Sequence, residues 1–164
     1  MASTKRHPFT MHYRTAATSQ GRILAMEADI VGDAGAYPYL SARILFAGAA
    51  LSTGPYKVPA LRTRSRAAFT NNVPTSAFRG FGAMQVVLGY ESQMDQLADA
   101  VGISRTAIRD LNYVEKGDVV TSGEPITTAV AVTETREKAL ARLGPPSPPS
   151  GPRKVVGQGF GNSM

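Results

Sequence analysis

Hydrophobic and polar residues alternate along the first thirty residues of the chain. Phe9, Met11 and Tyr13 are separated by polar positions, and a period of two is typical of a strand with one buried face. A second alternating run follows the turn at residues 19–21, which ends in a glycine. We therefore predict a β-hairpin with strands at residues 8–18 and 22–31. The inward positions of its second strand are Leu24, Met26, Ala28 and Ile30.

A third strand is predicted at residues 60–70, where arginine recurs at every second position. Side chains two residues apart in a strand point to the same face, so this strand should carry a row of guanidinium groups on one side. That row consists of Arg62, Arg64 and Arg66. The opposite face is expected to consist of Leu61, Ala67 and Phe69.

Apolar residues recur at spacings of three and four between Met84 and Val101, which predicts an amphipathic helix. Gly102 is placed to end this helix. Ser104 is placed to cap the next helix, which should end near Asn112. The apolar stripe of the first helix is Val86, Tyr90, Met94, Leu97 and Val101.

Weaker patterns predict two more helices. Residues 39–50 are rich in alanine and leucine, although Gly48 interrupts them. Thr133 is a candidate N-cap for a helix that ends near residue 143, and Glu134 and Lys138 lie one helical turn apart within it. Residues 32–37 and 113–132 lack a period and are expected to be loops and irregular structure.

These elements predict an α+β fold with an antiparallel sheet or hairpins and two or three packed helices. Residues 145–152 contain five prolines, so this tract can form neither a helix nor a central strand and is expected to be extended. The chain thus divides into a domain at residues 1–144, a proline-rich linker at 145–152 and a short further segment at 153–164.

The composition narrows the class of protein. A chain of 164 residues with 43% hydrophobic residues is typical of one globular domain. No run approaches the roughly 20 apolar residues that span a bilayer, and the N-terminal residues lack the apolar stretch of a secretory signal. The chain contains no cysteine, so it can hold neither a disulfide nor an iron–sulfur cluster. We expect a cytoplasmic protein without a membrane partner.

The formal net charge of +6 has more than one explanation. Nucleic-acid binding is disfavoured because the basic residues do not form a dense block interleaved with aromatic residues. The arginine row of the third strand can be a solvated sheet face or a surface that docks an acidic subunit. We therefore expect no nucleic-acid partner.

The segment Thr75–Gln85 carries the strongest signal for function. It contains an arginine, two phenylalanines and two glycines, and the predicted helix follows at once. Glycines permit close approach of a ligand, a guanidinium group offers a fork of donors and a phenyl ring offers a stacking surface. The segment is thus a candidate binding loop for a planar, partly anionic group. The alternative is a structural turn in which Arg79 makes a local salt bridge and Phe81 fills the core.

The same segment, AFRGFGAMQ, resembles the molybdenum hydroxylase family, which includes xanthine dehydrogenases and aldehyde oxidases. Four further segments similar to this family follow its order along residues 3–143. These segments are Lys5–Phe9, Gly32–Tyr37, Gly54–Pro59 and, in the last stretch, Glu91 with Leu97–Ala98 followed by Ile108–Asn112.

The resemblance implies part of the molybdenum cofactor-binding domain of the large subunit. It assigns Arg79 to a position beside the metal and Phe81 to stacking on the substrate. Gly80 and Phe78 would belong to the cofactor-binding loop, and Phe78 is expected to pack beneath it. Gly82 would allow the backbone to approach the cofactor.

The full enzyme of this family uses a molybdenum–molybdopterin cofactor to oxidise N-heterocycles or aldehydes with water as the oxygen source. Iron–sulfur and FAD modules would receive the electrons on partner chains, and the remaining large-subunit segments would be partners too. The family's catalytic glutamate lies near the far C-terminal end of the large subunit. We therefore assign no catalytic residue and expect this chain to be inactive alone. The alternative is a non-catalytic binding or assembly module that docks an acidic partner through the arginine row.

Other polar residues receive structural interpretations. Gln85 is expected to cap the loop or the start of the helix, and Glu91 to pair with a neighbouring cation. His7 and His12 are the two histidines of the chain, and neither is assigned a role.

Overall fold

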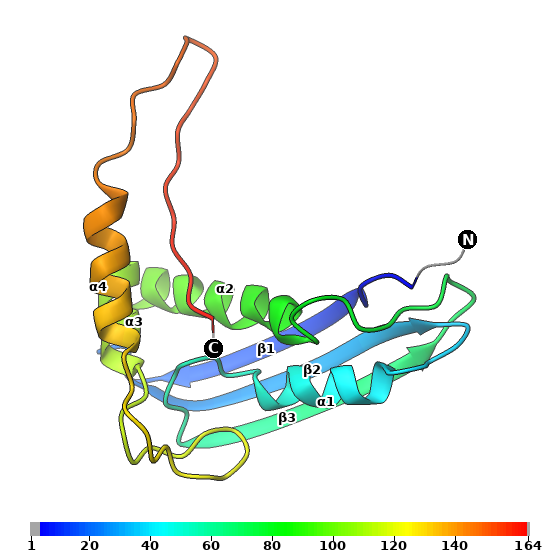
Figure 1. Ribbon diagram of the computed structural model, residues 1–164. Coiled ribbons are helices and arrows are strands. Elements are labelled where there is room, and N and C mark those ends of the chain that lie inside the picture. Colours follow the sequence, from blue (N-terminus) through cyan, green and yellow to red (C-terminus); the bar gives the residue numbers. More distant parts are fainter. Residues whose placement is uncertain (1–3, 164) are drawn as a thin grey trace.

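The computed structural model describes residues 4–163, which form a three-stranded sheet with helices on one of its faces (Figure 1). The sheet and the helices α1 and α2 make up two layers, and α3 and α4 lie at one end of them. The elements are β1 (Phe9–Ala17), β2 (Ile23–Gly35), α1 (Ser41–Ala50), β3 (Ala60–Phe69), α2 (Ala83–Val101), α3 (Arg105–Asn112) and α4 (Val132–Leu143).

The strand order is β1-β2-β3, and the predicted hairpin of β1 and β2 is confirmed as an antiparallel pair. The sheet as a whole is mixed, because β3 pairs with β2 in parallel beside this antiparallel hairpin. Helix α1 lies between these two strands in the sequence, and a helical crossover returns the chain to the same end of the sheet. The predicted α+β class is confirmed, as a mixed three-stranded sheet with four helices.

Three positions that were predicted to face inward are exposed. In β2, Ile23 is buried and Leu24 is 49% exposed, because the pairing register shifts between Ala16 and Ala17. Ala67 and Phe69 near the end of β3 are also exposed, and the register of β3 against β2 shifts at this end. Strand β2 itself continues to Gly35, so most of the predicted loop at residues 32–37 is strand.

The core lies between the sheet and helix α2, as the helical period predicts. Val86, Tyr90 and Met94 are almost completely buried, and Leu97 and Val101 are partly buried at the far end of the stripe. Gly102 adopts the left-handed conformation that ends α2. The Ser104 side chain accepts a hydrogen bond from the backbone of Ala107 and caps α3, as predicted.

Helix α4 begins differently from the prediction. Its N-cap is Ala131 and makes no side-chain hydrogen bond, so Thr133 lies inside the helix rather than at its cap. The hydroxyl of Thr135 donates to the carbonyl of Ala131, which also accepts the backbone N–H of Thr135. The predicted pair of Glu134 and Lys138 is confirmed.

A buried ion pair joins α2 to α3. Two nitrogens of the Arg109 guanidinium donate to Oε2 of Glu91, at 2.9 and 2.7 Å. Arg109 is 1% exposed and Glu91 9% exposed, and the hydroxyl of Tyr56 donates to the second carboxylate oxygen at 2.6 Å. The expectation that Glu91 pairs with a cation is therefore confirmed.

The last residues of the chain dock onto this cluster. Residues 145–152 form neither helix nor strand. They lie in the long loop that extends away from the domain between α4 and the C-terminus (Figure 1). Beyond it, the backbone carbonyl of Asn162 accepts a hydrogen bond from Tyr90, and its side chain contacts the hydroxyls of Tyr56 and Tyr113. Among residues 4–163, no helix combines the length and the hydrophobicity that a membrane crossing requires.

We predict that Arg109→Met lowers the free energy of unfolding by about 3–5 kcal/mol, because it leaves the Glu91 carboxylate buried without its cation. The matched control is Arg105→Met on the same helix. Arg105 pairs with Asp95 and Asp99 at the surface, so its loss should cost at most about 1 kcal/mol. Urea denaturation measures both values, and equal losses would contradict the buried pair.

Candidate functional site

The loop from Thr75 to Gly82 connects the end of β3 to the start of α2 and lies beside the N-terminal segment of the chain. Lys5 and Thr75 form a parallel bridge, and the backbone N–H of Ser76 donates to the carbonyl of Lys5 at 2.9 Å. The N-terminal segment therefore fixes the first part of the loop.

Three successive residues of the loop have positive φ angles: Gly80 at 95°, Phe81 at 47° and Gly82 at 99°. Phe81 is the single non-glycine residue with this conformation among residues 4–163. Such a conformation costs of order 1–3 kcal/mol and persists where the surroundings impose it. The loop is thus held in a strained, outward turn.

Helix α1 imposes this turn by its close approach to Gly82. A Cβ atom at Gly82 would lie 2.4 Å from the carbonyl oxygen of Ile44 and 2.9 Å from the backbone nitrogen of Gly48. Both contacts are with backbone atoms, which cannot move aside as a flexible side chain can. Only glycine therefore fits at position 82.

The side chains of the turn face outward. Arg79 is exposed, and Phe81 is 38% exposed at the surface next to the start of α2. No hydrogen bond or ion pair involves the Arg79 guanidinium within the part of the chain that the structure describes. The arrangement lacks the local salt bridge that a purely structural turn was expected to have.

Phe78 does not pack beneath the loop as expected. It is 58% exposed, and the guanidinium of Arg6 lies over its ring at 4.9 Å from the centroid. Arg6 also donates to the carbonyl of Arg79 at 2.9 Å, so one residue stacks on the loop and bonds its backbone. Sequence reasoning missed Arg6, although it belongs to one of the five resembling segments.

Asp33 anchors the residues that precede the loop. Its carboxylate accepts hydrogen bonds from the Thr70 hydroxyl at 2.5 Å, from the backbone of Gly35 at 2.8 Å and from the side-chain amide of Asn72. These bonds, with that of Thr70 the strongest, hold the pKa of Asp33 below its usual value. Sequence reasoning gave Asp33 no role, although the polar run at residues 70–72 was a signal for such a turn.

His7 and Gln85 tie the start of α2 to the rest of the domain. His7 is buried, and its Nε2 lies 2.7 Å from the Ser41 hydroxyl at the start of α1. Burial lowers the pKa of His7, so the ring is neutral where it packs. Gln85 donates to the His7 carbonyl at 3.3 Å, which agrees with its expected structural role at the helix start.

The arrangement suits a planar group with anionic oxygens. The unpaired donors of Arg79 and the exposed ring of Phe81 lie two residues apart on a turn fixed from both sides. The buried Oε1 of Gln85 has no hydrogen-bond partner among residues 4–163, so it is available to a donor from outside this segment. The first turn of α2 contains no acidic residue, so the positive end of the helix dipole is not neutralised.

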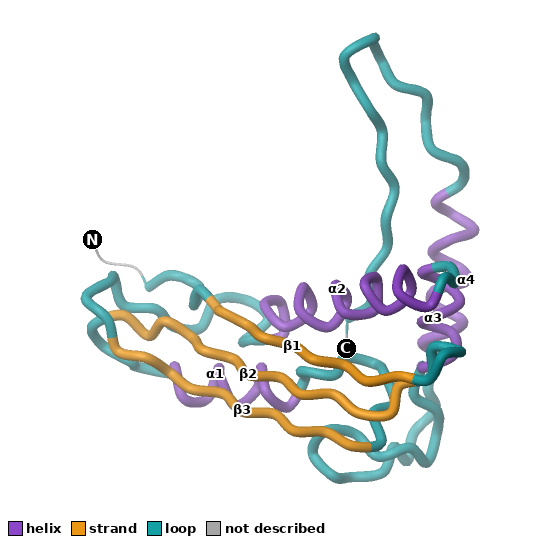
Figure 2. The backbone as a smooth tube through the Cα atoms, turned by 180° about the vertical axis from the view of Figure 1, so that it is seen from behind, coloured by secondary structure: helices purple, strands orange, loops and turns teal. Residues whose placement is uncertain are grey.

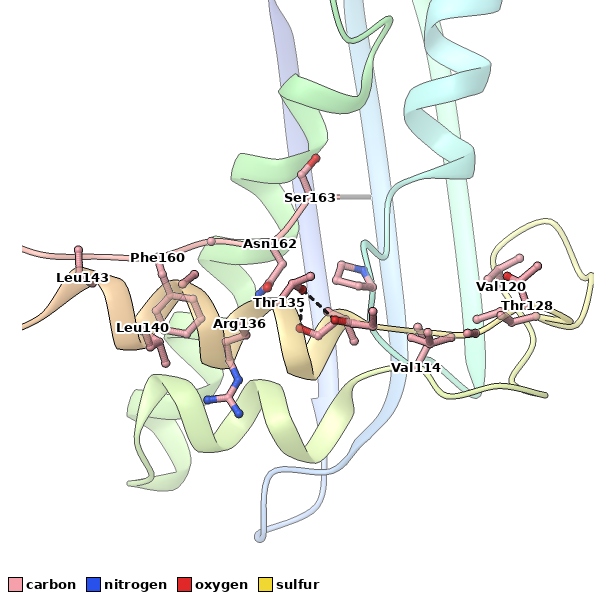
Figure 3. A pocket seen from close by; sticks show the side chains of 18 of the residues that line it. Val114, Val120, Thr128, Thr135, Arg136, Leu140, Leu143, Phe160, Asn162 and Ser163 are labelled. Carbon is pink, nitrogen blue, oxygen red and sulfur yellow. Dashed lines mark hydrogen bonds between the residues drawn. The ribbon is translucent and has the colours of Figure 1, made fainter.

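The described residues do not form a site in which side chains bind a metal ion directly. Residues 4–163 contain no group of three or more His, Asp or Glu side chains placed to hold a metal ion. A cavity of about 700 Å³ lies elsewhere, between α4 and the C-terminal segment, and is lined by Leu140, Leu143 and Phe160 among others (Figure 3). None of the predicted site residues lines this cavity.

Comparison with known proteins identifies related sequences. Residues 1–113 match the family model described as the molybdopterin cofactor-binding domain. The chain is 39% identical over 137 residues to the nicotinate dehydrogenase large molybdopterin subunit of Eubacterium barkeri. This match covers 84% of the chain and 32% of the relative.

Solved structures give the same result for the fold. Aldehyde oxidoreductase from Desulfovibrio desulfuricans matches with a TM-score of 0.80 and 34% identity, over 85% of this chain and 15% of its own. Quinoline 2-oxidoreductase from Pseudomonas putida matches with a TM-score of 0.70 and 27% identity, over 86% of this chain and 20% of its own. The chain therefore spans about a third or less of the length of these relatives.

We predict that Gly82→Ala destabilises the fold by about 2–4 kcal/mol, because strain at positive φ adds to the clash with the backbone of α1. The matched control is Gly117→Ala. Gly117 has a similar φ of 96° with no atom within 4 Å of an added Cβ, so it should lose only about 1 kcal/mol. Thermal or urea unfolding checks the difference, and equal losses would show that α1 does not constrain the loop.

Proposed function

Because this chain belongs to the molybdopterin cofactor-binding domain family of xanthine dehydrogenase and aldehyde oxidoreductase large subunits, we propose that it serves in a hydroxylase that oxidises N-heterocycles or aldehydes with water as the oxygen source. The observation that carries this proposal is the fixed, outward turn with an unpaired Arg79 and an exposed Phe81. The bound molybdenum–molybdopterin group supplies the two-electron chemistry, and the protein supplies position and electrostatics.

In this proposal, Arg79 holds the cofactor beside the metal. Its guanidinium group has no partner in the described chain, so its donors are free to bind anionic oxygens of the cofactor. Gly80 and Phe78 complete the cofactor-binding loop. Arg6 keeps Phe78 and the Arg79 carbonyl in place through its stacking contact and its hydrogen bond.

Phe81 orients the substrate. The turn fixes the backbone of Phe81 at a positive φ, and its partly exposed ring can stack on a planar heterocycle. This role supports an N-heterocyclic substrate such as the nicotinate or quinoline named for two of the relatives. An aldehyde without a ring would gain less from it.

The chain acts together with other parts of the enzyme. Residues 1–144 would form part of the cofactor domain, residues 145–152 a linker and residues 153–164 the start of the next cofactor-domain segment. The general base is expected in another segment of the large subunit, and iron–sulfur and FAD modules on partner chains would accept the electrons. The isolated chain should therefore have no hydroxylase activity.

We predict that this chain, expressed alone with cofactor supply, contains far less than one molybdenum atom per polypeptide. The loop residues touch one side of the cofactor, and the remaining contacts belong to other segments. Metal analysis of the purified protein checks this, with the assembled large subunit as the positive control. Stoichiometric molybdenum in the isolated chain would contradict the proposed division of the site.

We also predict that Phe81→Ala in the assembled enzyme raises KM for an aromatic heterocycle such as nicotinate by about two- to tenfold. This factor corresponds to the binding free energy of one aromatic stacking contact. KM for acetaldehyde should change little, because it has no ring to stack. The matched control is Phe69→Ala, another exposed phenylalanine, which lies at the end of β3. Steady-state kinetics measure both substrates, and equal effects on them would refute the stacking role.

A further inference from the structure

The outward face of the sheet is not covered by any described element. Helices α1 and α2 both pack on the other face. In the view from behind, β2 and β3 pass in front of α1, and α2 lies beside β1 (Figure 2). On this open face, arginines of the two edge strands flank two carboxylates of the central strand. We call this set the arginine ladder: Arg14, Arg62, Arg64 and Arg66, with Glu27 and Asp29 between them.

The carboxylates of the ladder are shared between arginines. The Glu27 carboxylate accepts a hydrogen bond from Arg14 of β1. Its other oxygen lies 3.6 Å from a guanidinium nitrogen of Arg62, the residue of β3 that pairs with Glu27 in the sheet. Asp29 accepts from Arg64 at 2.5 Å and from Arg66 at 3.1 Å. Hydrogen bonding from Arg64 holds the pKa of Asp29 below its usual value, so the carboxylate stays charged near neutral pH.

Because each carboxylate is shared between two arginines, the ladder has an excess of positive charge and of hydrogen-bond donors. The ladder has four guanidinium groups and two carboxylates, so two positive charges are not compensated within it. The arginine side chains remain 55–82% exposed. A third carboxylate of this face, Asp33, is bonded to Thr70 and Asn72 beyond the end of the ladder.

The carboxylates also restrict the arginines. A free arginine on a surface loses much rotamer freedom when it binds a ligand, which weakens the contact. In the ladder, that freedom is already reduced by the bonds to Glu27 and Asp29. The Cα atoms of Arg62, Arg64 and Arg66 repeat at about 6.6 Å along β3. The guanidinium groups of Arg64 and Arg66 converge on Asp29, and that of Arg62 approaches Glu27.

We propose that the arginine ladder is a docking surface for an acidic, extended segment of a partner protein that presents carboxylates at alternate residues. Such a segment has the same backbone repeat as β3, so its carboxylates can lie along the row of exposed guanidinium groups. This surface is formed by the strands alone and does not depend on the cofactor loop or on the proposed enzymatic function.

A protein partner fits this face better than a nucleic acid does. Binding of single strands combines basic groups with aromatic side chains on which bases stack. The strand positions in register with the ladder on the open face hold no Phe, Tyr or Trp; they are Thr10, His12, Ala16, Ala25, Val31, Asp33, Ala60 and Ala68. The exposed Phe69 is the single aromatic residue of β3 and lies past the register shift at the end of the strand.

The test is a binding titration of the full chain with a labelled peptide in which glutamate alternates with threonine. Arg62→Gln, Arg64→Gln and Arg66→Gln combined should weaken binding by about tenfold or more, since each lost charged contact removes a substantial share of the affinity. The matched control combines Arg22→Gln, Arg43→Gln and Arg153→Gln, which removes the same charge from exposed sites elsewhere. It should change the affinity less than about twofold.

A second triple variant replaces the same three arginines with lysine. It keeps the positive charge and serves as a second test in case the glutamine variant does not fold. Arg62→Lys, Arg64→Lys and Arg66→Lys combined should still weaken binding severalfold, because lysine lacks the planar fork. Circular dichroism confirms the fold of each variant.

Four results would overturn the proposal. They are absence of binding to the wild-type chain, equal losses in the two glutamine triples, unchanged affinity in the lysine triple, and tighter ladder-dependent binding of a single-stranded RNA or of phosphatidylserine vesicles than of the peptide.

Discussion

The contact between the backbone of α1 and Gly82 is the constraint on which the candidate site depends. At this contact the helix lies so close to the loop that no side chain fits between them. Gly48 of α1 is less tightly constrained, since an added Cβ there would lie 3.2 Å from the ring of Phe9 and 3.7 Å from the carbonyl oxygen of Gly82. Directly before this contact, Phe81 has a positive φ and Arg79 is exposed at the surface.

The rest of the domain fixes the two partners of this contact. His7 bonds Ser41 at the start of α1, and its carbonyl receives Gln85 at the start of α2. Asp33 holds the chain between β3 and the loop. At the middle of α2, the pair of Glu91 and Arg109 prevents the helix from sliding, because any shift would separate two buried charges. The loop is therefore positioned by the whole two-layer structure.

Much of this fold follows from the sequence, because the periods of two and of three to four locate the strands and α2 directly. The parallel pairing of β3 was not foreseen, although a helix between two strands is itself the signal for a crossover. Leu24 and Phe69 were misplaced because shifts in register leave no clear mark in a pattern of alternation. Within the site, Arg79 and Phe81 were identified from residue type and from the resemblance. Arg6, Asp33 and His7 were not, since their roles depend on contacts between residues 34 to 73 positions apart.

The central claim is that this turn presents Arg79 and Phe81 to a bound molybdopterin. An experimental structure of the assembled large subunit with its cofactor tests this most directly. The account predicts the Arg79 guanidinium beside the metal and the Phe81 ring on the wall of the substrate cavity, with Gly82 still against α1. A cofactor bound far from residues 78–82, or a Phe81 ring turned into the core of the domain, would contradict it.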